Sequence, residues 1–322
     1  MDFSIVPFSG DSPRGAPHPM PPWPSLANNA FCLKSSSWDS IFFYDSSPDG
    51  NSAKPVIILI HGLGDEADSW RHLVPLLGSQ GCRVLALDLP GFGRSAAPRK
   101  LNLKRHAAAV LRLIDALGQS SETGVAGLPP VFLAGNSLGA MVAEEAAFTR
   151  PDLIRGLVLL DGSIPGGPAN PGLFALAKLL FSRKWYRAYR DNPDGAWASL
   201  YPYYADLNAL SPQDREFLGQ RVMARVESST QERAYFATQS SLVRAFLLST
   251  HRFSRKIRRF KGKILLIWGE KDRIIPLSST ETFKALRTDI ELEIIPGAGH
   301  LPQQEKPVET ARLIEKFVLS SH

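Results

Sequence analysis

The stretch Val131-Phe-Leu-Ala-Gly135-Asn-Ser137-Leu-Gly139-Ala140 decides the fold. An apolar run leads into it and an Ala-rich run leads out of it, so the pattern predicts a strand, a tight turn and a helix. In such a turn, side chains two positions before and after the serine would collide with neighbouring elements, and Gly135 and Gly139 remove them. The turn would lift Ser137 above a sheet, at a helix N-terminus, as an exposed nucleophile. The alternative is an ordinary serine in a turn of small residues.

A serine hydroxyl is a weak nucleophile at neutral pH and needs a base. His300 is the best candidate, because its segment Pro296–Glu305 directly follows the last apolar run of the chain. A loop at that point reaches the carboxyl ends of parallel strands, where Ser137 is expected. The other histidines lie near the termini, in helix-like stretches or in other loops. Among these, His61 is interpreted as a residue that shapes its loop.

The base needs a carboxylate that fixes its tautomer. Asp272 follows the apolar run Ile264–Trp268 and completes the order Ser, Asp, His along the chain. Two other acids compete for this role. Glu270 lies two residues earlier, and Asp161 ends another apolar run, where it could assist or replace Asp272.

The reaction of a serine nucleophile with a carbonyl group forms an oxyanion, which needs two fixed N–H donors. The backbone of Leu138, directly after the nucleophile, is the first expected donor. The second is Leu63, in the loop His61-Gly-Leu-Gly-Asp65, where Gly62 and Gly64 let the backbone bend towards a substrate. A glycine turn with a purely structural role is the alternative.

The order of the apolar runs predicts the fold class. Continuous apolar runs are typical of strands that are buried on both faces of a parallel sheet. Two short β-like runs come first, at Phe31–Ser35 and Ile41–Tyr44. Six continuous apolar runs follow: Val56–Ile60, Val84–Leu87, Val131–Ala134, Leu157–Leu160, Ile264–Ile267 and Leu292–Ile295. Helix-like stretches lie between them: Lys104–Leu117, Leu138–Arg150 and Pro307–Val318. This alternation predicts a mostly parallel central sheet flanked by helices.

Two segments depart from the alternation. Residues 1–30 are rich in Pro, Gly, Ser and Asn in their larger part and are expected to form an irregular N-terminal arm. Residues 162–260 contain no clear buried strand and hold six of the seven tyrosines. They are interpreted as a helical cap inserted between the two halves of the core, residues 31–161 and 261–322. A separate helical domain is less favoured, because no linker-like sequence flanks the segment.

The motifs HGLGDEADSW, LDLPGFGRS, GNSLGA, WGEKDRIIP and GAGHLPQQEKP resemble the α/β-hydrolase superfamily. The resemblance is to the branch with a cap inserted after the sixth strand, and it covers about Cys32 to His322 apart from the cap. In that branch the residue after the first His-Gly contributes to the oxyanion hole, which supports Leu63. Dehalogenases and epoxide hydrolases of the superfamily carry aspartate at the elbow, so Ser137 disfavours both activities.

The resemblance also bears on the substrate. Asn136 and the segment Asp88–Gly93 occur in esterases and carbon–carbon bond hydrolases of the superfamily. The latter commonly carry Trp directly after the catalytic His, where this chain has Leu301. An aromatic-rich cap favours an apolar acyl or alcohol group, and Trp185, Leu301, Gly62 and Asn136 are the expected substrate contacts.

The expected reaction is therefore hydrolysis of a small, apolar carboxylic ester through an acyl-enzyme on Ser137. A carbon–carbon hydrolase, a thioesterase or an acyltransferase would use the same triad, and a non-catalytic ligand-binding protein would belong to a different class. The chemistry needs neither a metal nor an organic cofactor. The segment Leu173–Tyr189 combines apolar and basic residues, so it is a cap helix over the site or a lid that also contacts a membrane surface. The basic run Arg252–Lys263 is interpreted as a solvated return to the sheet, and contact with an anion or a membrane is the alternative.

The bulk composition sets further bounds. The net charge of +6 is too small to indicate nucleic acid as a partner. Cys32 and Cys82 have neither a metal-type nor a redox-type spacing and are expected to be buried, which is consistent with a reducing compartment. The N-terminus does not have the pattern of a secretory signal, so a cytoplasmic location is expected.

Overall fold

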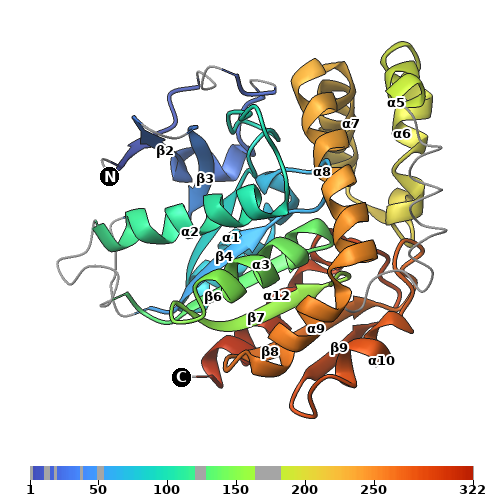
Figure 1. Ribbon diagram of the computed structural model, residues 1–322. Coiled ribbons are helices and arrows are strands. Elements are labelled where there is room, and N and C mark those ends of the chain that lie inside the picture. The colour runs from blue at the N-terminus through green and yellow to red at the C-terminus, as the bar shows by residue number, and fades with distance from the viewer. Residues whose placement is uncertain are drawn as a thin grey trace.

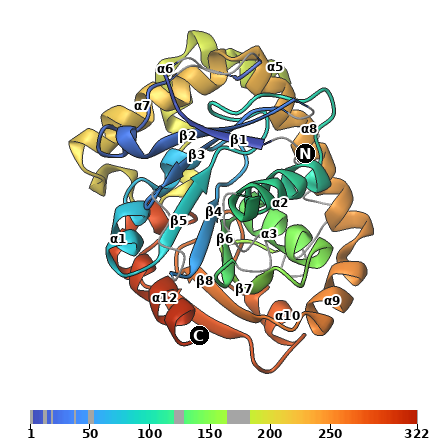
Figure 2. The same ribbon diagram turned by 90° about the vertical axis from the view of Figure 1, so that its left-hand side faces the viewer.

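A central sheet of nine strands organises the described part of the chain (Figures 1 and 2). The computed structural model describes residues 3–10, 15–17, 20–36, 39–48, 54–119, 128–163 and 183–321. The spatial order of the strands is β1-β2-β3-β5-β4-β6-β7-β8-β9. Their bounds are β1 (Phe3–Pro7), β2 (Ala30–Ser35), β3 (Ile41–Asp45), β4 (Val56–Ile60), β5 (Arg83–Leu87), β6 (Val131–Asn136), β7 (Ile154–Leu160), β8 (Lys263–Gly269) and β9 (Glu291–Ile295).

The strand directions match the fold that the sequence predicts. The six strands from β4 to β9 are parallel to one another, and the antiparallel strands β1, β2 and β3 extend the sheet beside β5. Each of the six apolar runs lies within one of the parallel strands. The carboxyl ends of these strands therefore meet at one edge, where the expected site residues were placed.

Two stretches of the N-terminal arm form regular structure, contrary to expectation. Phe3–Pro7 forms β1 and pairs antiparallel with β2. Farther along, Pro24–Asn29 forms a short 3-10 helix whose Leu26 is buried. The prediction of an irregular arm over 1–30 is wrong for these residues. These stretches have too few apolar residues to give a recognisable strand or helix pattern in the sequence, although in the folded protein they pack beside the sheet.

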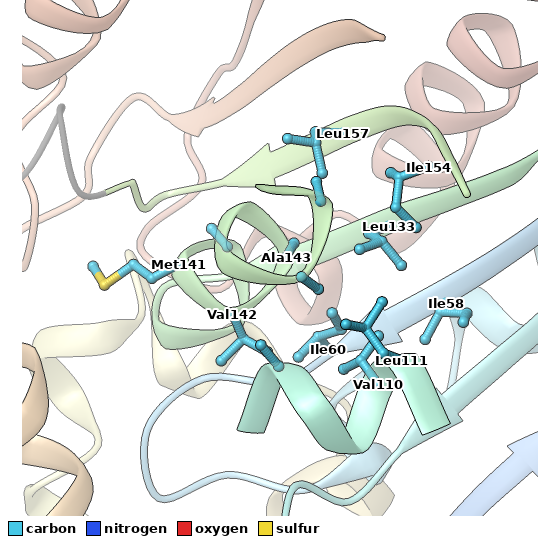
Figure 3. Close-up of a cluster of buried hydrophobic side chains, with 14 of the residues drawn as sticks. Ile58, Ile60, Val110, Leu111, Leu133, Met141, Val142, Ala143, Ile154 and Leu157 are labelled. Atoms are coloured by element: carbon cyan, nitrogen blue, oxygen red, sulfur yellow. The ribbon is translucent and has the colours of Figure 1, made fainter. Parts of the chain in front are cut away.

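Helices cover both faces of the sheet because successive side chains of a strand point to opposite sides. One face packs on α1 (Leu73–Ser79) and α12 (Pro307–Leu319), and the other packs on α2 (Leu103–Gln119) and α3 (Leu138–Thr149). Figure 3 shows the second layer, in which Ile58 and Ile60 of β4 face Val110 and Val142 of these helices. The resulting core holds α3, and with it Ser137, rigidly against the sheet.

Between β7 and β8 the described residues form helices and no strand, as the sequence predicts. We call the described residues 183–260 the cap. Its helices α5 (Arg183–Ala188), α6 (Pro193–Ala198) and α7 (Pro212–Glu227) gather at one end of the molecule (Figures 1 and 2). Helix α8 (Ser229–Leu248) leads away from them to α9 (Thr250–Arg259), whose buried side chains join the core on the side of α3. Most of the segment Leu173–Tyr189 lies outside the described residues. The basic run that begins at Arg252 forms part of α9, in which Phe253 and Ile257 are buried.

Two smaller expectations can also be compared with the structure. Cys32 and Cys82 are both buried, as expected, and each is a free cysteine. None of the helices in the described ranges is long and apolar enough to span a membrane.

Two short helices, α10 (Ser279–Lys284) and α11 (Pro302–Glu305), follow the cap along the chain.

Candidate active site

Ser137 stands in a strained turn between β6 and α3. Its φ of 54° is unusual for a residue other than glycine. A Cβ on Gly135 would lie 2.2 Å from the carbonyl oxygen of Gly139, and a Cβ on Gly139 would lie 2.0 Å from that of Ile60. Both glycines are therefore required by close backbone contacts, as the sequence predicts. The turn holds the serine at the carboxyl ends of the strands.

His300 and Asp272 come together at the same edge of the sheet. The Nδ1 atom of His300 lies 2.8 Å from Oδ2 of Asp272, and both side chains are buried. The other oxygen of Asp272, Oδ1, accepts backbone N–H bonds from Ile274 at 2.7 Å and from Ile275 at 3.0 Å. Three donors thus hold the Asp272 carboxyl group in one orientation.

The backbone of His300 is held from both sides. Its N–H donates to the carbonyl oxygen of Tyr203 in the cap at 2.9 Å. Its own carbonyl oxygen accepts a bond of 2.9 Å from the side-chain amide of Asn136. Asn136 was expected to contact substrate. It does line the cavity described below, but its amide N–H group anchors the loop that carries His300.

The two expected oxyanion donors lie on either side of Ser137. Leu138 is the first residue of α3, where the backbone N–H group has no acceptor within the helix. On the other side, the loop of Leu63 passes close to the nucleophile, since a Cβ on Gly62 would lie 3.6 Å from the Cβ of Ser137. Gly64 has a φ of 79°, a conformation that favours glycine.

His61 shapes this loop, as the sequence analysis expected. Its ring is fully buried, with Nδ1 2.8 Å from the carbonyl oxygen of Gly62, and its Nε2 accepts the backbone N–H of Leu89 at 2.9 Å. Burial lowers the pKa of His61. The ring is therefore neutral at pH 7, with its proton on Nδ1, and it ties the start of the loop to the segment after β5.

A cavity of about 490 Å³ lies between the cap and the sheet edge. Seven of the expected site residues line it: Gly62, Leu63, Asn136, Ser137, Leu138, His300 and Leu301. Most of the remaining lining is apolar or aromatic, for example Met141, Leu218, Val222, Leu242, Phe246, Ile274 and Ile275. A cavity of this size and character suits a small, mainly apolar molecule.

Trp185 is the one expected substrate contact that the structure does not place in the cavity. Its side chain is 65% exposed, whereas the next residue, Tyr186, is 7% exposed and lines the cavity. Neighbouring residues of a helix point about 100° apart, so only one of the two can face inward. The assignment of Trp185 is therefore wrong, and Tyr186 occupies the place expected for it.

The sequence analysis missed most of the polar lining. Four further tyrosines reach the cavity from the cap: Tyr189, Tyr203, Tyr204 and Tyr235. The concentration of tyrosine in residues 162–260 was the available signal, although it does not tell which of them face inward. Arg225 and Asp65 also line the cavity, where they form an ion pair of 2.6 Å. Their charges balance each other, which leaves no unpaired charge from these two residues in the cavity.

Acidic residues at the end of the Leu63 loop and just after it contact arginines of cap helix α7. Arg225 contacts Glu66 as well as Asp65, and Arg221 contacts Glu66 and Asp68 at 3.2 Å each. Arg221, Glu66 and Asp68 are almost completely buried. Buried charges of this kind are stable only when they are paired, so these contacts fix the cap onto the loop.

One cluster in the described residues has the spacing of a metal site: Asp161, Asp272 and His300, with one ligand atom from each within 4.8 Å of the others. In this cluster the Nδ1 atom of His300 already interacts with Asp272. The contacts within the cluster therefore account for its geometry without an ion.

Comparison with known proteins identifies the family. A profile of the alpha/beta hydrolase family matches residues 57–313. A pimeloyl-[acyl-carrier protein] methyl ester esterase of Methylococcus capsulatus is 29% identical over 83% of this chain and 96% of its own length. A 2-hydroxy-6-oxononadienedioate/2-hydroxy-6-oxononatrienedioate hydrolase of Comamonas testosteroni is 26% identical over 81% of this chain and 87% of its own.

Solved structures agree at the level of the fold. A thermophilic esterase from Thermogutta terrifontis superposes with a TM-score of 0.68 at 22% identity, covering 90% of this chain and 96% of that one. Because the family profile matches well over half of the chain, and these relatives hydrolyse their substrates as their names state, the chain belongs to the alpha/beta hydrolase family and is a hydrolase.

Proposed function

We propose that this hydrolase cleaves an uncharged carboxylic ester with a mainly apolar acyl or alcohol group, through an acyl-enzyme on Ser137. The observation that carries the proposal is the combination of Ser137 in a strained turn and a His300–Asp272 pair of 2.8 Å, both at one apolar cavity. The esterase among its relatives supports an ester as the substrate.

The proton path follows from the orientation of the imidazole. Because Nδ1 of His300 is held by Asp272, Nε2 is the nitrogen that takes the proton of Ser137 as Oγ attacks the ester carbonyl. The imidazolium then returns this proton to the leaving alcohol, and the acyl group stays on Ser137. Water, deprotonated by the same histidine, attacks the acyl-enzyme and releases the acid.

The negative charge of each tetrahedral intermediate falls on the former carbonyl oxygen. The N–H groups of Leu63 and Leu138 are proposed to donate to it, because these residues border Ser137 on two sides. Removing one such donor typically lowers kcat by about 10²- to 10³-fold. The cap excludes water from part of this space and strengthens these bonds.

The lining of the cavity supports an uncharged substrate. Its larger part is apolar, and its Arg225 and Asp65 neutralise each other. A free carboxylate on the substrate would need the positive charge of Arg225 and would have to break the pair of Arg225 with Asp65. The scissile bond itself is less constrained, since thioesters and carbon–carbon bonds next to a carbonyl group use the same nucleophile and base.

The test compares Ser137→Ala with Ser240→Ala, a matched control at an exposed hydroxyl of α8. Turnover of p-nitrophenyl esters of increasing acyl length should fall to background in Ser137→Ala and remain in Ser240→Ala. A fluorophosphonate probe should label the wild-type protein and Ser240→Ala but not Ser137→Ala. Substantial ester turnover by Ser137→Ala would refute the assignment.

The same panel separates the alternatives. If the probe labels the protein but no ester is hydrolysed, three further assays distinguish the alternatives. Cleavage of a thioester would indicate a thioesterase, and cleavage of a vinylogous diketone would indicate a carbon–carbon hydrolase. Acyl transfer to an added alcohol would indicate an acyltransferase. The carbon–carbon hydrolase among the relatives is the reason to include a diketone. Absence of both labelling and turnover would favour a non-catalytic binding protein.

A further inference from the structure

A second buried carboxyl group lies behind the proposed Asp272–His300 pair. Asp161 follows β7 directly and is completely buried. One oxygen of Asp161, one oxygen of Asp272 and one nitrogen of His300 all lie within 4.8 Å of one another. The sequence analysis left open whether Asp161 assists or replaces Asp272, and the hydrogen bonds of the two groups distinguish these roles.

Of the two carboxyl groups, Asp272 is the one whose ionised form the hydrogen bonds stabilise more. It receives three donors, namely the N–H groups of Ile274 and Ile275 and the ring nitrogen of His300. Asp161 receives one donor from the described part of the chain, the backbone N–H of Gly269, at 2.8 Å on Oδ1. Among the described residues its Oδ2 has no hydrogen-bond donor, although it is fully buried. A buried carboxylate oxygen without a donor is unfavourable, whereas a protonated one can donate to a nearby acceptor.

The backbone around Asp161 holds this carboxyl group in place. The φ of Asp161 is 48°, in the left-handed region, and its N–H donates to the carbonyl oxygen of Ile267. The next residue, Gly162, packs so closely on Ser137 that a Cβ there would lie 2.7 Å from the Cα of the serine. A strained conformation that persists under such constraints is often part of a functional site.

Building on the proposed function, we propose that Asp161 is a positioning residue whose protonated carboxyl group donates a hydrogen bond to Asp272 and fixes that carboxylate against His300. The pair then carries one proton and one negative charge in total. Asp161 is not among the described residues that line the cavity, so we expect its effect on the reaction to pass through Asp272.

The electrostatic surroundings support this protonation state. Burial, and next the charge of Asp272, raise the pKa of Asp161 well above its usual value, and Glu305 adds to the effect. Glu305 itself accepts N–H bonds from Ala205 and Gly299. The two neighbouring acids, Asp272 and Glu305, therefore disfavour a second negative charge at this position.

Two substitutions test the hydrogen bond through the pH profile of kcat. Asp161→Asn keeps a donor and carries no charge, so the acidic limb that reports His300 should stay in place and kcat should remain within about threefold of the wild-type value. Asp161→Leu keeps a similar size but has no donor. It should lower kcat by about tenfold with little change in KM, and it should move the limb to higher pH, because Asp272 then stabilises the imidazolium more strongly. A limb that moves to lower pH in Asp161→Asn would show that Asp161 is ionised and would overturn the proposal.

An infrared measurement tests the proton without relying on ester turnover. The difference spectrum between the wild-type protein and Asp161→Asn at pH 7 should contain the C=O stretch of a protonated carboxyl group. Asp194→Asn, at an exposed carboxyl of the cap, should not remove this band. If the band is absent, the proposal fails even when the enzyme is an esterase. If the band is present in a protein whose Ser137 does not react, the proposed function fails and the carboxyl pair remains.

Discussion

The substitution Gly139→Ala tests whether the close contacts of the nucleophile turn are required for both folding and activity. A Cβ at this position would lie 2.0 Å from the carbonyl oxygen of Ile60 and 2.9 Å from that of His61. Both atoms belong to the backbone where β4 passes into the proposed oxyanion loop, so no side-chain rotation relieves the overlap. An ordinary contact of this kind measures about 3.3 Å or more, and therefore α3 or the loop must move by about 1 Å.

The expected magnitude follows from this displacement. Forced overpacking in a rigid core costs about 1–3 kcal/mol, and we expect the upper end because the contact is backbone on backbone. A displacement of about 1 Å between a nucleophile and its stabilising donors can reduce the rate about 10²-fold. Gly139→Ala should therefore lower the free energy of unfolding by about 3 kcal/mol in urea denaturation and kcat/KM for an ester by at least about 10²-fold.

A glycine in the cap supplies the matched control. Gly219 lies within α7, and a Cβ added there would meet no atom within 4 Å. Gly219→Ala should raise the free energy of unfolding by about 0.5–1 kcal/mol, because alanine favours the helix, and should leave kcat/KM unchanged. If Gly139→Ala matched the wild-type protein in both assays, the argument that close packing demands glycine at the turn would be refuted.

Two further predictions concern buried charges. Burial lowers the pKa of His106 to about 3, with a smaller effect from His61, so the unfolded chain binds more protons below pH 6.5. The free energy of unfolding should therefore fall by about 2 kcal/mol between pH 7.5 and pH 5, as the ring of the unfolded chain takes up a proton. Urea denaturation should show a smaller change of this free energy over the same pH range in His106→Asn. Arg225→Leu leaves Asp65 and Glu66 short of a cation and should cost about 3 kcal/mol of stability. The double variant Arg225→Leu/Asp65→Leu should recover part of this stability. If the double variant were as unstable as Arg225→Leu or less stable, the proposed pairing of Arg225 with Asp65 would be contradicted.

The parallel half of the sheet was predictable from sequence for a simple physical reason. A strand that is buried on both faces must be apolar at every position, so Val56–Ile60 stands out as a continuous run. The turn at Ser137 was equally visible, because glycine is the only residue that its backbone contacts allow. By contrast, β1 is an edge strand that pairs only with β2, and its five residues carry a pattern no stronger than that of many loops.

The cap was predictable as a helical segment but not in its detail. Trp185 and Tyr186 are both large aromatics in one six-residue helix, and the sequence does not reveal which side of such a short helix faces the cavity. Similarly, Arg221 and Arg225 are one helical turn apart, a spacing that is usual on a solvated face. Their acidic partners lie about 160 positions earlier in the chain, and only the tertiary structure brings them together.

These long-range pairs make the cap part of the site rather than a cover over it. Asp65 ends the loop that carries Leu63 and Glu66 follows it, and both acids pair with arginines of α7 in the cap. If α7 moved away, the carboxylates of Asp65 and Glu66 would lose these partners at once, and an unpaired charge is costly in a low-dielectric interior. The position of the proposed oxyanion donor therefore depends on the cap being seated. Substitutions on α7 that break these pairs should lower kcat as well as stability, even where the substituted side chain never contacts the substrate.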